Sequence, residues 1–377
     1  MSEPMDSDSS SSTMYTNSSS TTDSFNSSMD SSMDSTATVV VHEPLPRPPI
    51  IKSIYKTTFK HPGYEFPNDV LLVLPRFDYS STSIQGVHYG TALTALKIIA
   101  NNTVHGYLTT DRAGRQRVEL DFNDILTESE YWFFVGLDVD LDGGMWYAVV
   151  PSFEDWQFPH NSPIVNWPRP DTKTIGRRCV ITATAELAKE TRLIPAGAGY
   201  PGEREWFVKN GMHQYKGGNV HKPDNEIALR YDLRHAFENC WFAIVPKRNH
   251  YVVHQFHDKP AGLEFATIYH NRIIQQLGNV PPEFLFASFA RTVLAFFTKQ
   301  CIIRSHVPRY VAVFRGWRPE MQFKYYSTSQ LYYNYSIYDS DEGDSKSGDE
   351  GDSESSDDES VPGQRLVISK AAERLFL

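Results

Sequence analysis

Apolar and polar positions alternate along the chain in patterns that predict its first regular elements. The run Val70–Leu74 is short, rich in branched side chains and followed by Pro75, which predicts a buried strand. Over residues 86–102, apolar side chains recur every three or four positions and predict an amphipathic helix that ends at two asparagines. Between Tyr131 and Val150, two apolar runs flank Asp142-Gly143-Gly144, whose composition predicts the tight turn of a hairpin.

The C-terminal half carries a second set of patterns. Two prolines open a segment from Pro281 to about Gln300 whose aromatic and aliphatic positions share one face, so we expect a helix packed on a core. Residues Tyr310–Phe314 and the tyrosine-rich stretch Tyr325–Tyr338 predict strands.

The two ends differ from this patterned body. Residues 1–36 contain 15 serines and few apolar side chains, and residues 339–360 contain 11 acidic side chains against Lys346, so we expect residues 1–48 and 339–360 to be disordered. The four prolines of Pro44–Pro49 predict an extended lead-in to the first strand. Residues 361–377 form a short C-terminal segment that can be helical.

Charge and cysteine content narrow the class of protein. The net charge is −10, but it arises from the two ends, and the remainder carries about +6, which suits either a nucleic-acid binder or an ordinary solvated surface. Three cysteines without paired spacing indicate neither a disulfide framework nor a thiolate zinc site. No secretory leader and no apolar run of about 18 residues is visible. We therefore expect an intracellular protein of the cytoplasm or nucleus that neither is secreted nor spans a membrane.

Residues 179–254 hold an ordered series of short motifs. They are Cys179-Val-Ile-Thr182, Thr191-Arg192-Leu-Ile-Pro195, Glu205-Trp-Phe207, Asp224-Asn225 with Ala-Leu-Arg230, Asp232-Leu-Arg234-His235, Val245-Pro-Lys247 and Val252-Val-His254. This series resembles the HNH endonuclease-like family common in fungal genomes. The resemblance implies a strand over Cys179–Thr182, a helix around Trp206 and an HNH-type ββα-metal core.

In that family, a histidine after the first strand acts as general base, an asparagine holds its loop and a helical histidine binds a divalent metal. The resemblance places Asn225 at the asparagine position, but Arg192 stands at the general-base position and Arg234 at the metal-histidine position, with His235 one residue later. A guanidinium cannot accept a proton near neutrality. One residue turns a helix by about 100°, so His235 is expected to point away from the site.

We therefore predict an α+β protein with an N-terminal α/β domain over 49–165 and an HNH nuclease-like domain over 166–338 with degenerate catalytic histidines. Three interpretations remain open at this stage. The first is an impaired pseudoenzyme that binds DNA or RNA through Arg192, Arg230 and Arg234. The second is an active endonuclease in which His235 binds Mg, Mn or Zn and another nearby group, such as His213, His221 or Glu190, supplies the base. The third is a protein-interaction scaffold without metal or nucleic acid.

Other polar side chains receive structural interpretations. His250 and His254 are expected to share one strand face, with a structural role favoured over metal binding. Lys247 is expected to be a solvated strand end, and the pair Arg177-Arg178 is a weak indication of phosphate contact.

Overall fold

The computed structural model describes residues 54–136, 146–165, 167–170, 176–195, 201–215, 223–258, 260–314 and 320–336. These residues form a mixed α+β structure, which confirms the predicted class. The predictions for residues 1–48, 339–360 and 361–377, and for the turn at Asp142–Gly144, lie outside the described residues. The predicted hairpin itself is wrong, because its two apolar runs do not pair: residues 130–135 pair with residues 56–60 and 106–109, and Val149 bridges Val311.

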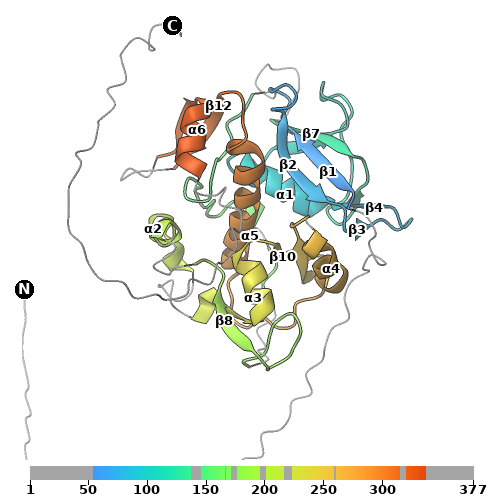
Figure 1. Ribbon diagram of the computed structural model, residues 1–377, viewed down its shortest axis with the longest axis vertical. Coiled ribbons are helices and arrows are strands. Elements are labelled where there is room, and N and C mark those ends of the chain that lie inside the picture. The colour runs from blue at the N-terminus through green and yellow to red at the C-terminus, as the bar shows by residue number, and fades with distance from the viewer. Residues whose placement is uncertain are drawn as a thin grey trace, which may run out of the picture. The chain divides into compact units, whose positions relative to one another are not determined.

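A four-stranded sheet forms the first part of the fold (Figure 1). Its spatial order is β2, β1, β7, β5, with β1 antiparallel to β2 and parallel to β7, and with β5 antiparallel to β7. The strands are β1 (Lys56–Lys60), β2 (Val70–Pro75), β5 (Gly106–Thr109) and β7 (Glu130–Val135). The predicted buried strand is confirmed, because β2 is largely enclosed and Leu71, Leu72 and Leu74 are fully buried.

A helix and a small sheet lie beside these strands. The small sheet contains β3 (Asp78–Tyr79), β4 (Gln85–His88) and β6 (Ile125–Leu126). Helix α1 (Tyr89–Ile99) follows β4 directly, and the ring of His88 caps it by accepting the backbone N–H of Thr91. The predicted amphipathic helix is confirmed, and Asn101 and Asn102 follow it in left-handed conformations that end the helical path.

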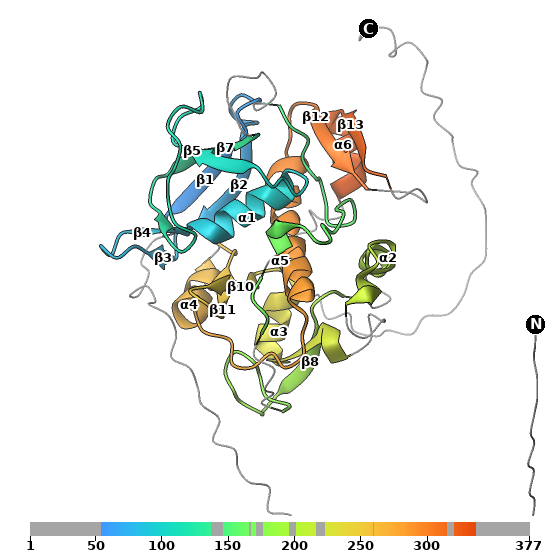
Figure 2. The same cartoon turned by 180° about the vertical axis from the view of Figure 1, so that it is seen from behind.

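Helix α5 (Pro282–Phe297) lies at the centre of the fold and packs against α1, β2 and β10 (Figures 1 and 2). Most of its side chains are buried, which confirms the predicted core helix. A π-helical turn, η4 (Thr298–Ile302), continues it. The hairpin β10 (Phe242–Lys247) with β11 (His250–Gln255) and helix α4 (Pro260–Tyr269) lie nearby.

The last described elements are β12 (Arg309–Val313), β13 (Gln322–Tyr326) and α6 (Thr328–Tyr335). The strand predicted at Tyr310–Phe314 is confirmed by β12. The strand predicted over Tyr325–Tyr338 is wrong beyond Tyr326, because Ser327 and Gln330 form a reciprocal capping box that starts a helix.

The remaining elements lie between residues 163 and 238. They are η1 (Pro163–Val165), β8 (Ala188–Arg192), α2 (Pro201–Lys209), η2 (Met212–Gln214), η3 (Pro223–Asn225), β9 (Glu226–Arg230) and α3 (Tyr231–Glu238). The expected helix around Trp206 is α2. The expected strand over Cys179–Thr182 is wrong, because the Cys179 carbonyl accepts the Ala183 N–H and closes a turn instead.

Side chains from both predicted domains share one hydrophobic core. The indoles of Trp156 and Trp206 stack with ring centroids 5.5 Å apart and an interplanar angle of 3°. The indole N–H of Trp206 also donates to the Trp156 carbonyl at 2.6 Å. The packing is therefore continuous across residue 165, and the predicted domain boundary there stays a prediction.

Candidate functional site

Strands β8 and β9 and helix α3 form a strand, strand and helix that contact one another, although α2 and two short helical turns separate the strands in sequence. The strands pair antiparallel, from Ala188 opposite Arg230 to Arg192 opposite Glu226. Helix α3 begins at the residue after β9 and buries Leu233, Ala236 and Phe237. Of its polar side chains, Asp232 and His235 are exposed to solvent, and Arg234 lies beside the two strands.

Asn225 fastens the end of β8 to the start of β9. Its backbone carbonyl accepts the Leu193 N–H at 2.9 Å. Its side-chain Oδ1 accepts the Ile194 N–H at 3.0 Å, while Nδ2 donates to the Ile194 carbonyl at 2.9 Å. The side chain is fully buried. The structure therefore brings Asn225 next to the segment that directly follows Arg192.

Each of the three arginines singled out from the sequence has an acidic neighbour. The Nε of Arg192 lies 3.5 Å from Glu226 Oε1 across the strand pair. Arg230 donates two bonds of 2.6 Å to Asp232 and a third to the Tyr269 hydroxyl, and the hydrogen bond from Arg230 lowers the pKa of Asp232. Arg230 is therefore held as part of the helix start rather than presented to a ligand.

Arg234 and His235 point in different directions from α3. Arg234 is half-buried, donates to Glu238 one turn later at 2.8 Å, and lines a hollow beside the strand pair. His235 is exposed, contacts Asn239 and meets Trp241 edge-on, and it does not line that hollow. The hollow has a volume of about 360 Å³. Its lining residues are Arg177, Ala188, Lys189, Glu190, Ala228 and Arg234.

The charges of this hollow suit an anion. Three cationic side chains and the carboxylate of Glu190 line it, and Arg177 lies 4.0 Å from Glu190. Guanidinium and ammonium groups bind phosphate oxygens, and no histidine is among the lining residues. The hollow thus offers groups that bind phosphate, and Glu190 as its acid–base group.

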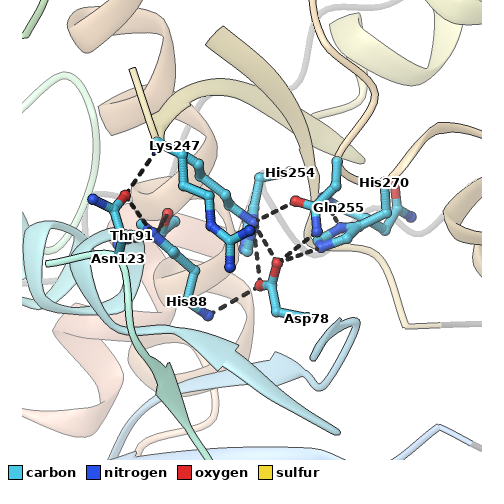
Figure 3. Close-up of polar contacts among 10 residues, drawn as sticks. Asp78, His88, Thr91, Asn123, Lys247, His254, Gln255 and His270 are labelled. Atoms are coloured by element: carbon cyan, nitrogen blue, oxygen red, sulfur yellow. Dashed lines mark hydrogen bonds and ion pairs between the residues drawn. The ribbon is translucent and has the colours of Figure 1, made fainter. Parts of the chain in front are cut away.

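A second group of polar side chains lies in the interior, around Asp78 (Figure 3). Asp78 Oδ1 accepts bonds from Lys247 Nζ at 2.7 Å, from Asn271 Nδ2 at 2.9 Å and from His270 Nε2 at 3.1 Å. Its Oδ2 accepts the backbone N–H of His88 at 3.0 Å. We call Asp78, Lys247, His254, His270 and Asn271 the Asp78 cluster. Every member is buried, so the prediction that Lys247 is a solvated strand end is wrong.

Burial and neighbouring charge set the protonation of the Asp78 cluster. Burial alone would raise the pKa of Asp78, but Lys247 and His270 hold it well below its usual value. Burial lowers the pKa of Lys247, and Asp78 opposes that shift. Burial and the nearby Lys247 also push the pKa of His254 well below its usual value. Near neutral pH the cluster is therefore an ion pair of Asp78 and Lys247 flanked by neutral imidazoles.

Asp78, His254 and His270 each offer a ligand atom, and these atoms lie within 4.8 Å of one another. Neither ring nitrogen of His254 has a hydrogen-bond partner among the described residues. However, the Gln255 N–H donates to His270 Nδ1 at 3.2 Å, so the ring proton sits on Nε2 and points at Asp78. A metal at Nε2 would force that proton onto Nδ1, facing a donor. Together with the ammonium of Lys247, this favours a hydrogen-bonded network over a divalent cation.

Sequence reasoning missed the Asp78 cluster because its members come from distant segments. Asp78 lies in β3, whereas Lys247 ends β10 and His270 follows α4. The local signal was weak, and consisted of a lysine at the end of the apolar run Phe242–Val245. His254 is fully buried in β11, and the structural role expected for it stays a prediction.

Comparison with family models, curated proteins and solved structures found no match to this chain. Among the described residues, every helix is too short or too polar to cross a bilayer.

Proposed function

We propose that residues 176–238 form a degenerate HNH-nuclease-like module that binds the phosphate backbone of DNA or RNA without cleaving it. The observation that carries this proposal is the position of Arg234, which lines the hollow beside β8 and β9 while His235 faces away. Support also comes from the succession of β8, β9 and α3, and from the two hydrogen bonds between the Asn225 side chain and the backbone of Ile194.

The side chains of the hollow explain why binding is proposed without hydrolysis. Hydrolysis through an HNH-type site needs a proton acceptor and a metal ligand within reach of one phosphate. Arg192 does not line the hollow, and Arg234 supplies neither group, because a guanidinium stays protonated. Among the described residues of the lining, Glu190 is the one side chain that could accept a proton or bind a metal, and it cannot do both at once. Three cations around the hollow also disfavour a divalent metal but attract phosphate. We therefore expect bound Mg, Mn or Zn only if the protein is instead an active endonuclease.

Binding is tested by titrating fluorescent single- and double-stranded DNA and RNA with the full chain at several salt concentrations. We expect affinity to fall as salt rises, because phosphate contacts release counterions. Arg234→Ala should weaken binding to all sequences and reduce the slope of log K against log salt by about 1. The matched control is Arg115→Ala, which removes an exposed arginine on the loop between β5 and β6 that does not line the hollow. Equal binding by wild type and Arg234→Ala would contradict the proposal.

The alternative activity is tested with supercoiled plasmid in Mg, Mn or Zn. We expect no nicking above the background of a mock preparation. Metal-dependent nicking that disappears in Glu190→Gln or His235→Ala would establish an active endonuclease and overturn the proposal. If nucleic acid does not bind at any salt concentration, the proposal is wrong and the interpretation as a protein-interaction scaffold takes its place.

A further inference from the structure

An aromatic groove of about 760 Å³ lies remote in sequence from the hollow beside α3. Its walls come from the loop after β1, from Trp146, from Val307-Pro308 and from β13. Three of its aromatic side chains are unusually exposed, namely Phe66 at 82 %, Tyr325 at 67 % and Trp146 at 53 %. We call this surface the aromatic groove. Exposed aromatic side chains that gather around one concavity indicate a binding site.

Neighbouring groups hold three rings of the aromatic groove in place, those of Tyr64, Trp146 and Tyr325. Tyr64 is buried at its base, and its hydroxyl accepts the Tyr310 N–H at 3.0 Å. Trp146 meets Tyr64 edge-to-face, with ring centroids 5.3 Å apart and planes at 70°. Tyr325 stacks on Tyr310 at 4.8 Å. Because these contacts orient the rings, a ligand would lose little free energy in ordering them.

The chemistry of the lining selects the kind of ligand. Of the described residues that line the aromatic groove, Glu65 alone carries a charge, so a basic ligand is favoured and phosphates are disfavoured. Aromatic-lined grooves bind proline-rich segments, because prolyl rings pack on aromatic faces and an extended polyproline segment loses little entropy on binding. The favoured ligand is therefore a proline-rich segment with a positive charge.

The chain carries such a segment just before its first strand. Residues 43–50 read Glu-Pro-Leu-Pro-Arg-Pro-Pro-Ile, with Arg47 among four prolines. Pro44 and Tyr64 are each ten residues from Ile54. A polyproline segment advances about 3.1 Å with each residue. A strand advances about 3.3 Å per residue, but only part of the path from Ile54 to Tyr64 is a strand, so that path spans a shorter distance per residue. A lead-in folded back at Ile54 therefore has the length to reach the aromatic groove.

We propose that the aromatic groove binds the chain's own proline-rich lead-in, residues 43–50, with Arg47 facing Glu65. Three observations carry the proposal: the exposed rings, the single carboxylate and the composition of the segment before residue 54. It is independent of the nucleic-acid proposal.

The test uses full-length chains and a fluorescent peptide of residues 41–53. In the wild-type chain the tethered lead-in competes with the peptide at an effective concentration in the millimolar range. A lead-in variant with Pro44, Pro46, Pro48 and Pro49 replaced by alanine should bind the peptide at least tenfold more tightly than wild type, measured by fluorescence anisotropy. Equal affinity of the two chains, or no binding to the lead-in variant, would overturn the proposal.

Side-chain variants then locate the site. In the lead-in variant, Tyr325→Ala and Phe66→Ala should each reduce peptide affinity at least fivefold, and thermal melts check that both fold. Tyr333→Ala is the matched control, because Tyr333 is 85 % exposed on α6 and does not line the aromatic groove. Equal losses in Tyr333→Ala and Tyr325→Ala would contradict the assigned surface.

A double-mutant cycle tests the orientation of the segment. Glu65→Gln in the lead-in variant and Arg47→Gln in the peptide should each weaken binding about threefold, and the two together should weaken it no further than either alone. Fully multiplicative effects would contradict the contact between Arg47 and Glu65.

Discussion

The ammonium of Lys247 lies 2.7 Å from Oδ1 of Asp78, although 169 residues separate them in the sequence. Both side chains are 3 % exposed. Asp78 belongs to the first half of the chain, whereas Lys247 and His270 belong to the second, so one carboxylate joins strands β3 and β10 with the segment after α4. Removing either charge would leave the other buried without compensation, which is the costliest way to break an ion pair.

We expect Lys247→Met and Asp78→Asn each to lower the free energy of unfolding by about 3 to 5 kcal/mol. The double variant should lose less than the sum of the two, because it leaves no uncompensated charge. Urea denaturation followed by circular dichroism measures all three. The control is Lys56→Met, whose ion pair with Asp258 is more exposed and is expected to contribute about 1 kcal/mol or less. Strictly additive losses would show that Asp78 and Lys247 do not act as a pair.

Stability should fall as the pH is lowered from about 6.5 towards 3. Burial, followed by the charge of Lys247, lowers the pKa of His88 to about 3, and burial also lowers the pKa of His61 to about 3. In that window the unfolded chain binds protons that the folded chain excludes, so acid favours unfolding. Each histidine contributes at most about 1.4 kcal/mol per pH unit. Free energies of unfolding measured between pH 7 and pH 4 test the slope.

His88→Asn isolates one of these groups. Asparagine keeps an oxygen for capping α1 but does not titrate, so the slope should decrease in this variant while stability near neutral pH changes little. An unchanged slope would show that His88 does not contribute to the acid sensitivity.

Zinc should not stabilise the protein through the Asp78 cluster. A site with a dissociation constant of about 1 µM would add about 4 kcal/mol at 1 mM metal. Because His270 already donates its Nε2 proton to Asp78, we expect thermal melts with and without 1 mM Zn to coincide. A rise in Tm that is abolished by His254→Leu would instead identify a metal site and change the interpretation of the cluster.

Asn225→Ala should destabilise the protein by about 2 to 4 kcal/mol, because it leaves the buried N–H and carbonyl of Ile194 without their side-chain partner. Asn225→Asp keeps the acceptor for the N–H but loses the donor to the carbonyl, so it should also destabilise. Chemical denaturation measures both, with the exposed Asn239→Ala as control. A loss of less than about 0.5 kcal/mol of unfolding free energy in Asn225→Ala would show that the hydrogen bonds of Asn225 do not hold the backbone of Ile194 in place.

Local pattern was sufficient for the elements whose signal lies within a few residues. The periodic apolar positions of α1 and α5 and the short apolar run of β2 predicted these elements correctly. The tyrosine-rich stretch failed because strand propensity and the cap of Ser327 with Gln330 compete there, and the cap prevailed.

The candidate site divides in the same way. The resemblance predicted that Arg192 and Arg234 stand at the positions of two catalytic histidines, and the rotation of about 100° per helical residue predicted that His235 would point away from the site. What it did not predict was the hydrogen bond from Arg230 to the Tyr269 hydroxyl, since 39 residues separate the two. The hydrolytic ancestry of β8, β9 and α3 stays a prediction.

By itself, the sequence determined the helices and strands with strong periodicity. Only the tertiary structure decided that Lys247 is buried, that Asp78 is its counter-ion and that separate segments build the aromatic groove. The physical reason is that periodicity reports which face of an element is apolar. The partner of a buried charge depends instead on which distant segments pack together, and no local pattern encodes that choice.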